Sequence, residues 1–189
     1  FCQLAGQTNY VGVDHPAGLG GSIGLVALTV NGPLELRGSP GDEDINVFAD
    51  SVFNSPVTMD FGDGHNFVFA RADAASGSLA LPPVEFRREV FVTGGGGLDR
   101  YELGNAEVLD SVTAFLEGGN DVIRLVTRNS VTIALNVDLG PGQIDRAFLT
   151  GRYSGQLSGG VGDSDELVRE PEEIFGDVVV TDFETIRLF

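Results

Sequence analysis

The sequence predicts an all-β protein, a right-handed parallel β-helix (β-solenoid) with coils of about 22 residues. Apolar residues alternate with polar ones at a period of two, in runs rich in Val, Ile, Phe and Thr. No window of helical length sustains the three- and four-residue apolar spacing of an amphipathic helix. A Gly-rich turn followed by Asp or Asn also recurs along the chain, which indicates stacked structural repeats.

The repeat begins with a Gly-rich turn, continues with Asp or Asn, and ends in an alternating apolar run. It is clearest at 41–47, 62–69 and 118–125, and looser at 96–103, 142–149 and 162–168. The positions taken as equivalent are Asp44, Asn66, Asp99, Asp121, Asp145 and Asp165. Glycine permits the sharp bend, and Asp or Asn can hydrogen-bond the neighbouring backbone, so each motif is expected to form a corner of a coil.

Each coil is expected to hold a second strand that leads into the next glycine turn. The runs 57–61, 112–116 and 131–139 supply these strands, whereas 74–88, with Pro82 and Pro83, predicts a loop that leaves the regular path. An antiparallel β-sandwich or jelly roll also needs many short strands with Gly turns and is the alternative fold. Residues 1–22 are expected to form an irregular lead-in or cap, and 23–189 the solenoid domain.

The charge of the chain excludes several classes of partner. Its 28 acidic and 11 basic residues give a formal net charge of −17, and all the basic residues are Arg. Nucleic acid and anionic membranes are therefore not expected as partners, while cations and glycans are. No stretch is long and apolar enough for a membrane span, and the single Cys2 has no intrachain disulfide partner.

The tandem units from about 38 to 168 resemble the degenerate Gly-x-Gly-x-Asp repeats of large secreted bacterial β-solenoid proteins, which are similar to hemolysin-type calcium-binding repeats. The calcium-binding repeats recur every nine residues, whereas here the unit is more than twice as long. The resemblance implies secretion or a cell-surface location, a stack of β-coils, and a surface, adhesive or scaffold role.

Stacked coils would bring the repeated aspartates into a column with a spacing of about 4.8 Å. A hard cation such as Ca²⁺, which takes six to eight oxygen ligands, would relieve the repulsion within such a column. The predicted metal ligands are Asp42, Asp44, Asp63, Asp121, Asp163 and Asp165. The competing interpretation is that these aspartates only cap turns and stay solvated.

Arginines near the start of the repeated strand suggest one enzymatic alternative. Arg100, Arg124 and Arg146 beside aspartates resemble the Arg, Asp and calcium grooves of β-helical polysaccharide lyases and epimerases. Arg next to an acid on a strand also forms ordinary cross-strand ion pairs. The chain lacks the sequence motifs of serine hydrolases, phosphate-binding loops and zinc proteases, so no catalytic residues are predicted.

The sequence therefore predicts an extracellular structural, adhesive or filament-forming protein, stabilised by calcium, and not an enzyme. A carbohydrate-binding β-sandwich module is a further alternative. Strand-forming sequence covers 178–189, and an uncapped strand edge there would pair head-to-tail with another copy. A glycan or another cell-surface molecule is the other expected partner.

Overall fold

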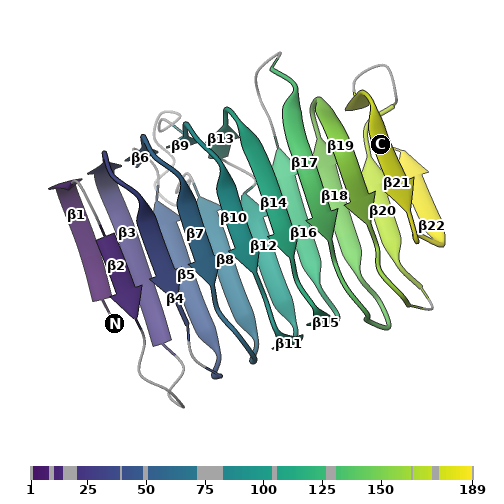
Figure 1. The fold of residues 1–189 in the computed structure, drawn as a ribbon, viewed down its shortest axis with the longest axis horizontal. Helices are drawn as coiled ribbons and strands as arrows, with labels where there is room; N and C mark the ends of the chain where they lie inside the picture. The colour runs from purple at the N-terminus through teal and green to yellow at the C-terminus, as the bar shows by residue number, and fades with distance from the viewer. Residues whose placement is uncertain are drawn as a thin grey trace, which may run out of the picture.

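A computed structural model shows two long parallel β-sheets that face each other across a continuous apolar core (Figure 1). It describes residues 2–8, 11–14, 21–38, 40–48, 51–71, 83–103, 106–126, 131–162, 164–171 and 175–188. The chain passes along one sheet, turns at a corner, returns along the other sheet and then enters the next coil. The protein is a β-solenoid, as the sequence predicts.

The larger sheet, here called sheet A, contains the strands that follow the repeated glycine turns, together with other strands. Its order is β13-β9-β6-β3-β5-β8-β12-β16-β18-β20-β22, with β1 also paired to β3. The bounds are β1 (Cys2–Thr8), β3 (Gly21–Val30), β5 (Glu43–Phe48), β6 (Val52–Phe53), β8 (Asn66–Arg71), β9 (Val84–Phe86), β12 (Asp99–Leu103), β13 (Ala106–Val108), β16 (Val122–Val126), β18 (Arg146–Thr150), β20 (Glu166–Arg169) and β22 (Thr185–Leu188).

The second sheet, sheet B, has the order β2-β4-β7-β10-β14-β17-β19-β21. Its strands are β2 (Val11–Asp14), β4 (Leu34–Arg37), β7 (Val57–Asp60), β10 (Val90–Thr93), β14 (Ser111–Phe115), β17 (Ile133–Asp138), β19 (Tyr153–Ser158) and β21 (Val178–Thr181). Two glycine pairs, β11 (Gly96–Gly97) and β15 (Gly118–Gly119), form a short separate ladder at the corner. Every described strand pair is parallel, so the antiparallel sandwich alternative is wrong.

The core is built from the residues that point inward on both sheets. In β16, Ile123 and Leu125 are buried while Arg124 is exposed, as the alternation predicts. In β12, Tyr101 and Leu103 are buried and Glu102 points outward. Successive coils repeat this alternation, so inward side chains stack along the molecule and bury apolar surface between the sheets.

One expected equivalence is shifted by a residue. Asp44 was predicted to match Asn66, but the structure pairs Glu43 with Asn66 and places Asp44 opposite Phe67. This register brings Ile45 against Val68, and both side chains are fully buried. A one-residue slip would exchange the inner and outer faces of the strand, so core burial determines the register.

Several predictions fall partly outside the described residues. Within residues 1–22, the expected lead-in, β1 and β2 pair with β3 and β4. Most of the expected loop at 74–88 lies outside the described residues, although its end contributes β9, which pairs with β6 and β13. No helix in the described part of the chain is long and apolar enough to cross a membrane.

Candidate functional site: a buried aspartate column

Five equivalent polar residues form a column at the corner where the chain enters sheet A. We call Asn66, Asp99, Asp121, Asp145 and Asp165 the aspartate column. The strand pairings place them at the same position in successive coils. Each lies two residues before an inward-facing apolar residue, so its side chain also points inward, and all five have an exposed fraction of 0%.

The column connects the coils through a repeated hydrogen bond. The backbone N–H of Asp99 donates to Oδ1 of Asp121 (2.9 Å), that of Asp121 to Asp145 (2.6 Å) and that of Asp145 to Asp165 (2.8 Å). The column therefore replaces strand pairing at the point where each strand begins.

Residues at the two ends of the column extend the same pattern. The backbone N–H of Asn66 donates to Asp99 Oδ1 (3.2 Å), and its Nδ2 donates to the same oxygen (2.8 Å) and to the carbonyl of Gly62 (3.2 Å). At the other end, the Asp165 N–H donates to Glu184 Oε2 (2.7 Å). Glu184 was missed by sequence reasoning because the repeat was defined by Asp and Asn alone.

The second carboxylate oxygen, Oδ2, has different surroundings in different members of the aspartate column. In Asp99 it accepts the N–H of Gly95, four residues earlier (3.2 Å). Four residues before Asp145 stands Pro141, which has no N–H to donate. Oδ2 of both Asp121 and Asp145 is buried without a hydrogen-bond partner among the described residues.

Burial changes the protonation of these carboxyls. Loss of solvent raises the pKa of Asp121 to about 8, although the hydrogen bond from the Asp99 backbone opposes this and the neighbouring acids add to it. Burial likewise raises the pKa of Asp145 to about 7 and that of Asp99 to about 6, where bonds from Asn66 and Gly95 lower it. Near neutral pH part of the column is therefore uncharged. The second oxygen of a neutral carboxyl carries an O–H that can act as a hydrogen-bond donor.

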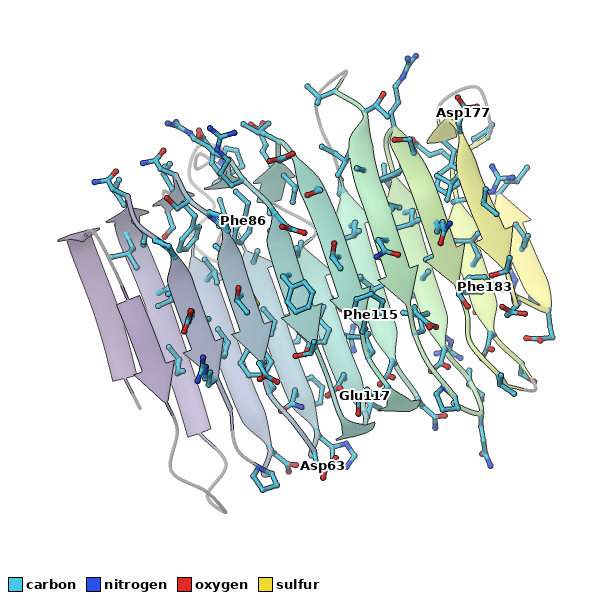
Figure 2. All side chains as sticks on the ribbon, viewed as in Figure 1. Asp63, Phe86, Phe115, Glu117, Asp177 and Phe183 are labelled. Atoms are coloured by element: carbon cyan, nitrogen blue, oxygen red, sulfur yellow. The ribbon has the colours of Figure 1, made fainter. Side chains whose placement is uncertain are left out.

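The five predicted metal ligands that the structure describes do not all lie together. Asp121 and Asp165 belong to the buried column, with Asp145 between them, whereas Asp44 is exposed on the outside of β5. Asp42 and Asp63 are exposed at the corner and accept the backbone N–H of His65 and Gly96 respectively, both at 2.9 Å (Figure 2 labels Asp63).

Asp163, the sixth predicted ligand, lies outside the described residues. Among the described residues no three His, Cys, Asp or Glu side chains are grouped so that they could hold a metal ion.

A shallow depression of about 570 Å³ lies over the same corner, outside the column. Its walls include His65, Leu98, Asn120 and Gln143, and glycines form part of its floor. Asn120 is engaged within the turn, because its Oδ1 accepts the backbone N–H groups of Gln143 (3.0 Å) and Ile144 (3.1 Å). The depression is thus a surface of mixed polar and apolar residues at the glycine turns.

The arginines considered for lyase chemistry lie on the other side of sheet A from the column. Arg100, Arg124 and Arg146 point outward, while Asp99, Asp121 and Asp145 point inward. The acids beside these arginines are Glu102, which pairs with Arg100, and Glu166, which lies 3.6 Å from Arg146. The described residues therefore contain cross-strand and same-strand ion pairs here, and the Arg and Asp sets are separated by the sheet.

Comparisons of the chain with protein-family models, with curated proteins and with solved structures gave no match.

Proposed function

We propose that this chain is a structural β-solenoid of an extracellular or cell-surface protein. Its role is to form an extended structure that associates with other copies, and not to catalyse a reaction. The observation that carries this proposal is the end of the stack at β21 and β22, where strand edges and apolar core residues remain accessible. The acidic composition and the resemblance to secreted solenoids support the extracellular location.

Within the described residues, β22 pairs in sheet A with β20 alone, and β21 pairs in sheet B with β19 alone. Ile186 pairs with the buried Leu167 and occupies an inward position, and it is 50% exposed. Val178, Val180 and Phe183 are only partly buried against the core (Figure 2 labels Phe183). Another parallel coil would continue both sheets and cover these side chains.

The occupant that we propose for this end is a second copy of the chain, added head-to-tail. A heterologous contact of this kind does not close on itself and produces filaments. Edge hydrogen bonds would supply affinity, and the inward apolar residues would define the stacking position.

The test is the sedimentation of the full chain over a wide range of concentrations. We expect concentration-dependent association that Ile186→Lys abolishes, because the variant places a charge where the core would continue. Val161→Lys is the matched control, since Val161 is 82% exposed and lies in the turn between β19 and β20, outside the β21 and β22 edge. A wild-type chain that stays monomeric throughout, or an Ile186→Lys chain that associates normally, contradicts end-to-end assembly.

A further inference from the structure

The outward face of sheet A carries an unusual group of arginines for so acidic a protein. Across β12, β16, β18, β20 and β22, the charged residues that point outward are Arg100, Glu102, Arg124, Arg146, Glu166 and Arg187. We call these six the arginine stripe. Four positive groups face two negative ones, whereas the whole chain has a net charge of −17.

The glutamates of the stripe already have partners. Glu102 pairs with Arg100, whose guanidinium also lies 6.0 Å from the ring centre of Phe69. Glu166 lies 3.6 Å from Arg146 and 2.9 Å from Arg187. Arg124 is exposed and makes no ion pair or hydrogen bond within the described part of the chain. Arg124 lies opposite Glu102 in the strand register, but Glu102 pairs with Arg100, so Arg124 is the arginine of the stripe without an ion pair among the described residues.

The outward face of sheet B has the opposite character. On β7, β10, β14, β17, β19 and β21 the only charged residues are Asp60 and Asp138, and both are exposed; on β4 the exposed Arg37 lies opposite Asp60 and pairs with Glu35. Phe115 lies between them in the same row, is 38% exposed, and makes an edge contact with Phe91 (Figure 2 labels Phe115). We call Asp60, Asp138 and Phe115 the acidic face.

The two faces share the strand spacing of one stack, although Asp60 and Asp138 lie three strands apart and Arg124 and Arg146 lie on neighbouring strands. Both belong to parallel sheets of one stack, so side chains in neighbouring strands repeat at about 4.8 Å on each of them. Phe148, the neighbour of Arg124 in its row, is only partly buried and faces outward as Phe115 does. A copy placed with its arginine stripe on the acidic face of another could thus form ion pairs next to an aromatic contact.

We propose that the arginine stripe of one copy docks on the acidic face of a second copy, so that solenoids associate side by side. The two surfaces lie on opposite sides of the stack, and the contact is therefore heterologous and open-ended. This inference rests on the proposed structural role and adds a lateral contact to the end-to-end one. Net repulsion between copies does not forbid it, because charges farther apart than about 8 Å are largely screened at physiological ionic strength.

Charge reversal on each face separately provides the test. We expect Arg124→Glu with Arg146→Glu to abolish lateral association, measured by sedimentation and electron microscopy at physiological ionic strength. Asp60→Arg with Asp138→Arg should do the same. Mixing the two variants should restore association, because each variant then meets a face of opposite charge. The matched control is Arg88→Glu with Arg152→Glu, which makes the same charge change at exposed turn positions.

Each outcome is decisive once the variants show wild-type melting temperatures, as exposed substitutions should. Restoration by mixing, together with normal association of the control, supports the proposal. With Ile186→Lys present to remove end-to-end growth, association that survives either double reversal overturns it, as does a mixture that stays dispersed. Introducing Ile186→Lys into the same samples separates the two contacts, because loss of end-to-end growth should leave lateral pairs intact.

Discussion

The buried carboxyls of the aspartate column are the residues with the most unusual chemistry in this protein. Asp121 and Asp145 each use one oxygen to bind the adjacent coil and keep the other away from solvent. Asn66 occupies an equivalent position and donates hydrogen bonds through its amide. A protonated Asp resembles this amide in shape and in neutrality, so we interpret the column as an asparagine-like ladder that depends on bound protons.

The column should make the protein more stable in mild acid than in mild base. The pKa values of Asp99, Asp121 and Asp145 are raised from 3.8 to about 6, 8 and 7 in the folded state. Their contribution to folding is therefore fully present below about pH 4, falls as the pH rises from there, and is lost for each carboxyl once the pH passes its own folded-state pKa, between about 6 and 8. Each carboxyl can change the free energy of unfolding by about 1.4 kcal/mol per pH unit between the ordinary pKa of 3.8 and its own folded-state pKa.

Asp121→Asn should remove part of this pH dependence. The variant is neutral at every pH and its amide can donate from the position of Oδ2, so we expect similar stability to the wild type at pH 4 and higher stability at pH 9. Urea unfolding at both pH values measures the difference. Asp63→Asn, at an exposed corner, should not alter the pH profile. A steeper loss of stability at pH 9 in Asp121→Asn would contradict the neutral-acid interpretation.

At the scale of the strand and its corner, the sequence predicted the repeat well from Asn66 onward. The alternation in β12 and β16 is visible in the sequence because each strand has strongly apolar inward positions. It also implies that Asp99 and Asp121 face inward, being two residues before Tyr101 and Ile123. Spacing alone predicted calcium ligands, Asp121 among them, or solvated turn caps, since the burial of these acids depends on contacts between coils that spacing does not reveal.

The misplaced Asp44 has a different cause. Its neighbourhood contains three acids, Asp42, Glu43 and Asp44, and the motif can be aligned to any of them. Only the packing of Ile45 and Val47 in the core selects Glu43 as the partner of Asn66. The corner glycines pose a similar problem, because the sequence does not show which of them approaches another backbone closely.

Gly140→Ala should destabilise a corner. Gly140 has a φ of +81°, and an added Cβ would overlap the carbonyl oxygen of Glu117 in the preceding coil. We expect a loss of more than about 1 kcal/mol in the free energy of unfolding. Gly118→Ala is the control, because its Cβ would meet nothing nearer than the Pro141 oxygen at 3.7 Å. Equal thermal midpoints for the two variants would show that this backbone approach is unimportant.

For the molecule as a whole, charge is the dominant feature. A net charge of −17 on 189 residues produces self-repulsion that cations would reduce. We therefore expect millimolar Ca²⁺ to raise the melting temperature relative to excess chelator at matched ionic strength. A larger rise with Ca²⁺ than with Mg²⁺ would indicate a dedicated oxygen site, and coincident curves with Ca²⁺ and with chelator would contradict calcium stabilisation.

The hydrogen bonds of the column join residues 20, 22, 24 and 33 positions apart, so each coil depends directly on its immediate neighbours. Folding of such a chain can start from any adjacent pair of coils and spread outward, one coil at a time. Opening should correspondingly begin at the ends, with amide hydrogens exchanging fastest in β22 and slowest in the central strands β12 and β16. The terminal coils would then open and close repeatedly while the central coils stay folded.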